Sequence, residues 1–327
     1  MTPNWMVVIP TDERVELSYG ATAVEYLAWL TTLLGAAALA LVAVRPPVRF
    51  FRRSEAESPP RAGRLQPPTG IEPAVSVVLP AYQAAHLVGA AVTEVSAALG
   101  GHVALDGPLE IVVVDDGSTD GTAEAARRAG ADVVVSLDAN RGKGAAVRAG
   151  MLAASGRLRL FTDVDLAYPP GQLASLIDAL RDGADVALGN RRHAEARTIS
   201  PARPARVFAS RMFNAFTRLV LLRRYRDTQC GFKGFTAGAA EEIFGRAVID
   251  GFAFDVEVLY LVEHLELTTA EVPVTVDHSA DTTVRLVAQL PRVVADIGRI
   301  RHRAAAGAYD APRVPPSGMP AGPAPQA

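Results

Sequence analysis

The sequence predicts an α/β fold, in which a mostly parallel sheet carries helices on both faces. Segments 75–79, 110–115 and 160–162 have the apolar, β-branched character of buried strands, and the first two lead directly into helical runs. Strands that alternate with helices between residues 74 and 190 are typical of a parallel sheet covered on both sides. We expect one transmembrane helix to precede this domain.

The N-terminal region predicts that membrane anchor. Residues 26–44 are uncharged and mostly apolar, long enough to cross a hydrocarbon core of about 30 Å as a helix. A cleaved signal peptide fits poorly, because residues 1–25 carry four acids and no basic stretch before the apolar run. Arginines at the start of the basic, Pro-rich linker 45–73 place the C-terminal part on the cytoplasmic side and residues 1–25 outside. Since the segment is Ala-rich, a peripheral or partner-packed helix is the alternative.

Two further segments follow the predicted catalytic domain of residues 74–290. In residues 291–306 the apolar positions 293, 294, 297 and 300 share one helical face among arginines. Such a basic amphipathic helix suits either an anionic membrane surface or packing on the domain. Residues 307–327 are rich in Pro, Ala and Gly, and we expect them to be a disordered tail.

Polar side chains gather where the predicted strands end. Tyr82 follows the first strand, Asp115 and Asp116 end the second, and Asp163 and Asp165 follow the third. In open parallel sheets ligands bind at the carboxyl ends of the strands, so these five residues predict one site. Two carboxylates at positions i and i+2 suit a divalent cation that carries phosphate oxygens. A solvated pair of loop acids is the plainer alternative for Asp163 and Asp165 taken alone.

Composition limits the possible partners. The net charge of −2 gives no reason to expect nucleic acid, and a single cysteine, Cys230, excludes an internal disulfide. Lys143 and Lys233 are the only lysines among 33 basic residues, and both lie beside glycines. A lysine ammonium is a compact point charge, whereas an arginine guanidinium is a planar fork, so the two lysines predict positions near phosphate that need a point charge. The alternative is that two lysines survive by chance in an arginine-rich sequence.

Several motifs together resemble a known family. They are Val-Leu-Pro-Ala-Tyr at 78–82, Val-Asp-Asp-Gly-Ser-Thr-Asp-Gly-Thr at 114–122, Asn-Arg-Gly-Lys-Gly at 140–144 and Asp-Val-Asp at 163–165. In this order and spacing they resemble family 2 glycosyltransferases of the Rossmann-like GT-A fold. Asp-Thr-Gln-Cys-Gly-Phe-Lys at 227–233 and Phe-Asp-Val-Glu at 254–257 resemble the dolichyl- or polyprenyl-phosphate glucosyltransferase group. The resemblance covers residues 74 to about 290.

The resemblance implies a role for each matching residue. The catalytic residues would be Asp165, Asp255, Lys233 and Gln229. The nucleotide-sugar site would comprise Pro80, Ala81, Tyr82, Gln83, Asp115, Asp116, Lys143, Asp163 and Val164. Arg191, Arg206, Ser210 and Arg285 would contact an acceptor phosphate, while Asp163 and Asp165 would hold Mg²⁺ or Mn²⁺. Position 83 departs from the pattern, because it is Gln where many relatives have Glu.

The expected reaction is an inverting transfer of a hexose, with glucose from UDP-glucose preferred, to a polyprenyl or dolichyl phosphate at the cytoplasmic membrane face. GDP-mannose is the alternative donor. A hydroxyl acceptor is the alternative acceptor, and it would require a base such as Asp255 because a hydroxyl, unlike a phosphate, is not already ionised. A nucleotide-sugar-binding protein without catalysis is a third class, which the intact Asp163 and Asp165 pair disfavours. Buried acids need partners, so a structural ion pair competes with function at Asp255.

Overall fold

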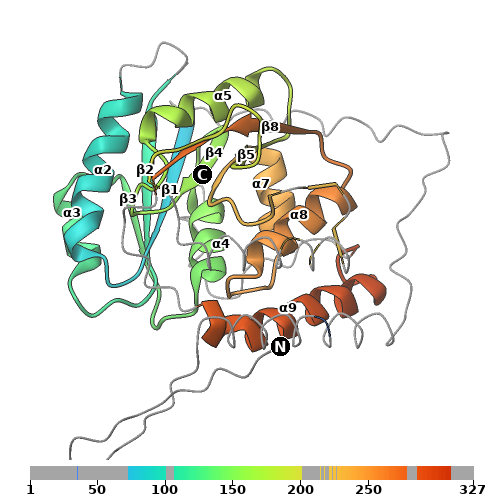
Figure 1. Cartoon of the computed structure of the whole chain (residues 1–327). Helices are drawn as coiled ribbons and strands as arrows, with labels where there is room; N and C mark the ends of the chain where they lie inside the picture. The colour runs from blue at the N-terminus through green and yellow to red at the C-terminus, as the bar shows by residue number, and fades with distance from the viewer. Residues whose placement is uncertain are drawn as a thin grey trace, which may run out of the picture.

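A computed structural model describes residues 73–100, 107–200, 227–277 and 286–310, with Gly35, Asn214, Thr217, Leu221, Leu222, Arg224 and Tyr225. Its strands and helices alternate along the chain as the sequence predicts (Figure 1). The strands are β1 (Val75–Ala81), β2 (Leu109–Asp115), β3 (Val133–Ser136), β4 (Leu158–Thr162), β5 (Val186–Asn190), β6 (Arg197–Thr198), β7 (Phe232–Thr236), β8 (Thr269–Pro273) and β9 (Thr275–Val276). The helices are α2 (Ala85–Leu99), α3 (Thr122–Arg128), α4 (Lys143–Ala153), the 3₁₀ turn η1 (Pro170–Gln172), α5 (Leu173–Arg181), α7 (Ala237–Phe244), α8 (Phe254–His264) and α9 (Leu286–Ala305).

Seven of these strands form one sheet, in the order β3-β2-β1-β4-β7-β5-β8. The pairs β1–β2, β2–β3, β1–β4 and β5–β8 are parallel, whereas β7 runs antiparallel to both of its neighbours. The sheet is therefore mostly parallel, as predicted. Because β7 enters between β4 and β5 from the opposite direction, the segment just before it meets the carboxyl end of β4.

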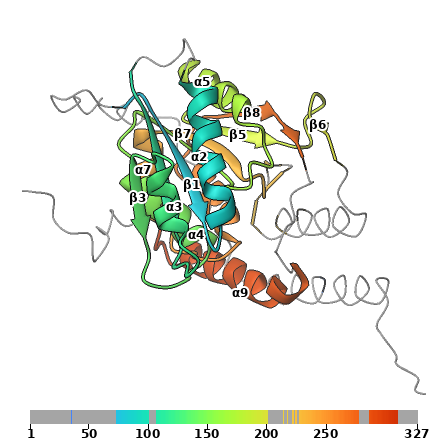
Figure 2. The ribbon, with the colours of Figure 1, turned by 90° about the vertical axis from the view of Figure 1, so that its left-hand side faces the viewer.

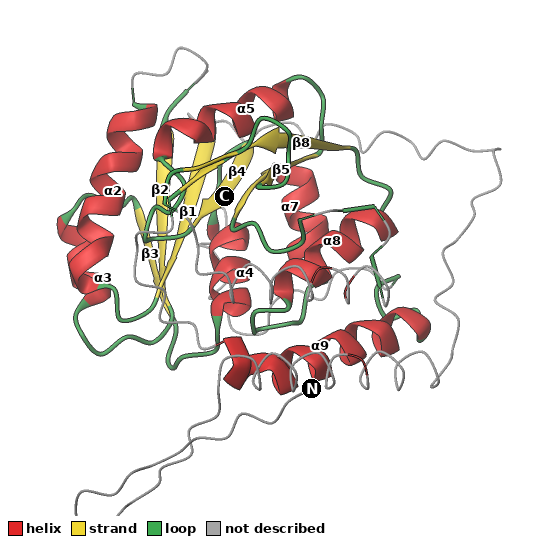
Figure 3. Cartoon of the chain, viewed as in Figure 1, coloured by secondary structure: helices red, strands yellow, loops and turns green. Residues whose placement is uncertain are grey.

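The sheet separates two apolar cores, which explains the continuous apolar runs of the central strands. Val112 and Val114 face the core beneath α4, α7 and α8, while Ile111 and Val113 face the core beneath α2 and α5. Figure 2 shows α2 and α3 in front of one face of the sheet, and Figure 3 shows the strands enclosed between helices. Burial on both faces fixes the register of each strand, and with it the residue at which the strand ends.

The C-terminal helix begins earlier than predicted. Helix α9 starts at Leu286, not at residue 291, and Val293, Ile297 and Ile300 are buried in the same core as α8. Its apolar face is thus packed on the domain, which decides between the two placements that the sequence left open. Residues 307–310 also belong to the described structure, and Tyr309 is 1% exposed. The expectation of disorder is wrong for these four residues, because a buried aromatic ring holds them.

The predicted membrane span lies outside the described residues, except for Gly35. Within the part of the chain that the structure describes, no helix is both long enough and apolar enough to cross a membrane. The linker up to residue 72 and residues 311–327 of the tail also fall outside the described ranges.

Candidate active site

The loop after β2 is tied to the loop before α4 through Asp116. Both oxygens of this buried carboxylate accept backbone amides, from Arg141 at 2.8 Å and from Gly142 at 2.8 Å. Gly142 adopts a φ of +111°, and an added Cβ would lie 2.6 Å from the carbonyl oxygen of Asp250, so only glycine fits there. Asp116 therefore fixes where α4 begins, in addition to any contact with a nucleotide.

That loop presents Lys143 to the carboxyl end of β4. The Nζ atom of Lys143 lies 2.5 Å from Oδ1 of Asp163, and both side chains are partly exposed. Burial alone would lower the pKa of Lys143, but the charges of Asp163, Asp255 and Asp165 together raise it above its ordinary value. The ammonium is thus held protonated among three acids, Asp163 and Asp165 from the loop after β4 and Asp255 from α8.

Asp165 lines a small pocket, whereas Asp163 lies against the start of β7. Asp165 accepts the amide of Ala167 at 3.2 Å, and it borders a hollow of about 280 Å³ together with Val164. The rest of the hollow is lined by Leu87, Ala90, Ala91, Glu94, Leu166, Ala167 and Asp277. Asp163 sits directly against Gly231, where a Cβ would meet Oδ2 at 2.5 Å. The glycine before β7 is therefore what lets this carboxylate lie beside the antiparallel strand.

The donor set fits Mg²⁺ or Mn²⁺ only with oxygens from a substrate. Among the described residues no group of three or more His, Cys, Asp or Glu side chains forms a metal cage. Mg²⁺ commonly uses one or two carboxylates and completes its shell with substrate phosphates and water. Asp163 and Asp165 can supply such a pair, although Oδ1 of Asp163 already contacts Lys143.

Lys233 and Asp255 form a second ion pair, and this one is buried. Nζ of Lys233 donates to Oδ1 of Asp255 at 2.5 Å and to the carbonyl of Cys230 at 2.5 Å, while the two residues are 1% and 5% exposed. Removal from water raises the pKa of Asp255 despite the attraction of Lys233 and Lys143. Two residues predicted as catalytic are thus brought together, with each as the other's partner.

The turn after β1 is joined to the loop after β2. Pro80 and Ala81 lie in the buried strand, whereas Tyr82 is 51% exposed. The amide of Gln83 donates to Oγ of Ser118 at 2.8 Å, and its side chain donates to Thr119 at 3.0 Å. The neutral amide at position 83 therefore works as a link between the two loops, where Gln supplies both a donor and an acceptor.

Arg191, predicted to contact the acceptor phosphate, is engaged by Asp227. Nε and Nη2 of Arg191 lie 2.8 and 2.7 Å from the two carboxylate oxygens, a bidentate arrangement. The pKa of Asp227 is lowered, since Arg191 outweighs the opposing effect of burial. Arg191 is 24% exposed at its side chain, so a phosphate can meet only its remaining surface. Gln229 follows this pair and is half-buried.

The family model for glycosyl transferase family 2 matches residues 76–244, more than half of the chain. The chain belongs to this family. Dolichyl-phosphate beta-glucosyltransferase of Drosophila melanogaster is 41% identical over 177 residues, covering 50% of this chain and 54% of that protein. The enzyme of the same name from Saccharomyces cerevisiae is 30% identical over 222 residues, covering 61% of this chain and 66% of that protein.

The family 2 chain spans about half the length of the curated relatives that it matches. Among solved structures, mannosyl-3-phosphoglycerate synthase from Rubrobacter xylanophilus aligns with a TM-score of 0.51 at 23% identity, over 76% of this chain and 79% of that one. At this identity the likeness supports the fold alone, and it agrees with the predicted GT-A class.

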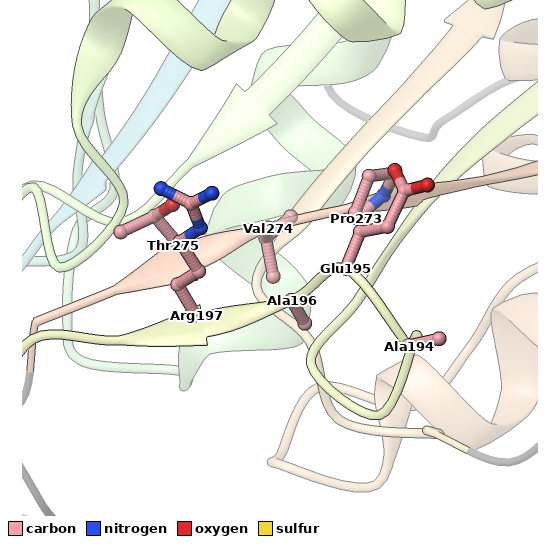
Figure 4. Close-up of a pocket in the computed structure, with 7 residues that line it drawn as sticks. All are labelled: Ala194, Glu195, Ala196, Arg197, Pro273, Val274 and Thr275. Atoms are coloured by element: carbon pink, nitrogen blue, oxygen red, sulfur yellow. The ribbon is translucent and has the colours of Figure 1, made fainter.

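Three predicted acceptor residues of the family 2 chain, Arg206, Ser210 and Arg285, lie outside the described residues. A larger hollow of about 500 Å³ lies between the turn before β6 and the segment joining β8 to β9. Figure 4 shows Arg197 and Thr275 at one end of it and Glu195 beside Pro273 at the other. None of its lining residues was predicted for the site, and the pocket beside Asp165 is the one that adjoins the acids.

The sequence alone missed two contributors. Tyr168 is buried, packs against Phe232 with the rings tilted and their centroids 5.3 Å apart, and hydrogen-bonds with Cys230. Asp250 pairs with Arg141 at 3.1 Å and with Arg148 at 2.5 Å. It therefore supports residues 141–144, which we call the Lys143 loop, from the side of residues 248–250. Neither residue stands in a quoted motif, and no sequence pattern links Asp250 to Arg141 and Arg148, which lie 109 and 102 positions away from it.

Proposed function

We propose that this chain transfers glucose from UDP-glucose to a polyprenyl or dolichyl phosphate, with inversion at the anomeric carbon. The observation that carries the proposal is the meeting of Lys143, Asp163 and Asp165 at the carboxyl edge of the sheet. Relatives named dolichyl-phosphate beta-glucosyltransferase support the choice of sugar and acceptor. The nucleotide would lie on Tyr82, Gln83, Asp115 and Asp116, and the diphosphate near Lys143.

The chemistry needs positive charge where the leaving group departs. As the bond from the anomeric carbon to the nucleotide breaks, the diphosphate takes up the electron pair and becomes more negative. Lys143 is held protonated there, and the start of α4 adds the positive end of a helix dipole. A Mg²⁺ or Mn²⁺ held by Asp163 and Asp165 would supply further charge to the phosphate oxygens.

The acceptor determines whether a base is required. A lipid monophosphate is largely ionised near neutral pH and attacks through its own oxygen, so it needs cations to hold it in line. Arg206, Ser210 and Arg285, with the open side of Arg191, are the groups proposed for this task. Asp255 would then act with Lys233 as a buried pair that shapes the pocket below the sugar.

A hydroxyl acceptor is the second candidate function. The raised pKa of Asp255 favours it, because a carboxylate with higher proton affinity is a better base. Its salt bridge to Lys233 and 5% exposure weigh against it. A mannosyl transfer from GDP-mannose uses the same residues and differs only in the donor.

We place the reaction at the cytoplasmic face of a membrane, with residues 26–44 as a single span. The apolar length of that segment and the arginines after it support this arrangement. The lipid acceptor and the anchor would then share one bilayer.

The test is transfer of radiolabel from UDP-glucose and, separately, GDP-mannose to a short-chain polyprenyl phosphate in detergent, with Mg²⁺, Mn²⁺ or EDTA. Labelled lipid from UDP-glucose that disappears with EDTA is the expected result. Labelled lipid from GDP-mannose alone would show that the donor is GDP-mannose and not UDP-glucose. Label found only on a hydroxyl compound would show that the acceptor is not a lipid phosphate.

The variant Asp165→Ala tests the metal pair in the same assay. Its turnover should fall to the level of the wild-type protein in EDTA, while the unfolding temperature should fall only slightly, because the half-buried Asp165 carboxylate accepts a loop amide from Ala167. The control is Asp182→Ala, at an exposed position after α5, which should retain full activity. Wild-type rates that survive chelation would remove the metal from the reaction.

A further inference from the structure

The last four described residues close a buried contact on the back of the domain. Gly307 has a φ of +66° and Asp310 donates its amide to the Gly307 carbonyl at 3.0 Å, forming a tight turn. His264 contacts the Asp310 carboxylate at 2.8 Å. We call residues 307–310 the C-terminal latch.

Tyr309 is the part of the latch that enters the domain. Its ring lies 5.4 Å from that of Tyr260 and 5.2 Å from the Arg303 guanidinium, and its carbonyl accepts from Arg246 Nε at 3.1 Å. Its hydroxyl donates to Oε1 of Glu257 at 2.7 Å. If the Tyr309 hydroxyl were removed, the buried Glu257 carboxylate would lose one of its hydrogen-bond donors.

Glu257 connects Tyr309 to the segment between α7 and α8. Its carboxylate is fully buried and accepts the amides of Val248, at 3.0 and 3.1 Å, and Ile249, at 2.8 Å. A buried carboxylate is tolerated only with several donors, and here Tyr309 is one of three. The position of residues 248–250 therefore depends on a carboxylate that needs all three donors.

Residues 248–250 form the support of the Lys143 loop. The amide of Ala145 donates to the Asp250 carbonyl at 3.2 Å, and the Asp250 carboxylate holds Arg141 and Arg148. At Gly144 an added Cβ would lie 2.4 Å from the carbonyl oxygen of Ile249, so the two backbones are in contact. A shift of residues 248–250 must move the start of α4.

We infer that Tyr309 is a positioning residue. It fixes the position of the Lys143 ammonium through Glu257 and residues 248–250. The path runs from the Tyr309 hydroxyl to the Glu257 carboxylate, through two backbone amides, to the backbone that supports Gly144. The kinetic consequence rests on the proposed function, whereas the structural consequence does not.

The test compares Tyr309→Phe with Tyr225→Phe in the full chain in detergent. Tyr225 is a matched control, since it is a buried tyrosine whose hydroxyl bonds with Thr269, away from this path. Hydrogen exchange measured by mass spectrometry follows peptides that cover residues 141–146 and 247–250. In Tyr309→Phe both peptides should exchange roughly tenfold faster, and in Tyr225→Phe neither should change.

Glucosyl transfer gives the second readout. Tyr309→Phe should lower kcat/KM for UDP-glucose severalfold and leave the KM for polyprenyl phosphate unchanged, because the path ends at the donor site. Faster exchange confined to residues 247–250, or equal effects of the two variants, would overturn the inference. Faster exchange at residues 141–146 in a protein that transfers no sugar would uphold the inference and refute the proposed function instead.

A second variant covers the case in which Tyr309→Phe does not fold. Gly307→Ala strains the turn at a positive φ and leaves every buried atom in place. It should loosen the latch and speed exchange at residues 141–146 to a smaller extent. Unchanged exchange there, together with faster exchange at 303–310, would show that the latch does not reach the site.

Discussion

At the scale of single residues, Lys143 joins the two halves of the proposed donor site. It directly follows the loop that Asp116 holds by two amides, and its ammonium meets the carboxylate of Asp163. A positive charge at the first position of a helix opposes the helix dipole, so the neighbouring acids are what make it favourable. The same acids keep it protonated, which is the state that a departing diphosphate needs.

Replacing Lys143 tests that role. Lys143→Gln should lower kcat by roughly 100-fold, comparable to removal of one preorganised donor, with a smaller change in donor KM. Lys143→Arg should recover only part of the rate, because the planar guanidinium does not fit a point-charge position. The control is Arg127→Gln on α3, whose exposed pair with Glu124 should contribute nothing measurable. Steady-state kinetics decide, and equal rates for Lys143→Gln and the control would contradict the assignment.

The Arg191–Asp227 pair predicts a pH dependence of stability. The pKa of Asp227 lies below its ordinary 3.8 in the folded protein, so its ionised form stabilises the fold above that value, and this contribution disappears as pH falls through the lower folded value. Asp227→Asn should cost roughly 1.5–3 kcal/mol of unfolding free energy at pH 7. Urea unfolding between pH 7 and pH 3 should show the difference between the two proteins shrinking below about pH 4. A constant difference would show that the pair does not titrate as described.

At the scale of elements, the start of α4 is fixed by close backbone contact. Gly142 and Gly144 flank Lys143, and each lies against the 249–250 backbone with no room for a Cβ. Helix α4 therefore cannot slide toward or away from β4 without separating from α8, and the distance between Lys143 and Asp163 is set by packing.

The variant Gly144→Ala should show this constraint. A Cβ 2.4 Å from the Ile249 carbonyl oxygen forces the backbone to move, which should cost about 1–3 kcal/mol of stability and lower kcat/KM for the donor. Gly238→Ala is the matched control, since it lies in α7 with nothing within 4 Å of its added Cβ. That change should stabilise the protein by roughly 0.5–1 kcal/mol and leave activity unchanged. Thermal unfolding and kinetics of the two variants separate the explanations, and an active Gly144→Ala would refute the constraint.

At the scale of the whole molecule, the sheet and the edge that carries the site follow from local patterns, whereas the partners do not. Buried β-branched runs that stop at Tyr82, Asp116 and Asp163 predict the strand ends, because two-sided burial leaves one register. The partner of Arg191 is 36 residues away and that of Glu257 is 52 away, at distances where no periodicity links them. The composition of residues 307–327 also predicted a disordered tail from residue 307 onward. Composition alone does not show that one aromatic side chain, Tyr309, is buried in the domain.

The proposed anchor gives the prediction for the whole chain. A segment of 19 uncharged residues inserts as a span when its apolar burial exceeds the cost of its backbone, which a helix satisfies internally. The full chain, expressed in bacteria, should stay in the membrane pellet after alkaline carbonate extraction. Added to inverted vesicles, protease should cleave the catalytic domain if, as proposed, the arginines from 45 to 53 keep it on the cytoplasmic side. One variant reverses the charge of four arginines, Arg45→Glu, Arg49→Glu, Arg52→Glu and Arg53→Glu. It should reduce the fraction of chains cleaved in inverted vesicles, while the chain stays in the membrane pellet. Extraction of the unaltered chain by carbonate would instead identify residues 26–44 as a peripheral helix, and the lipid acceptor would then have to be reached from the membrane surface.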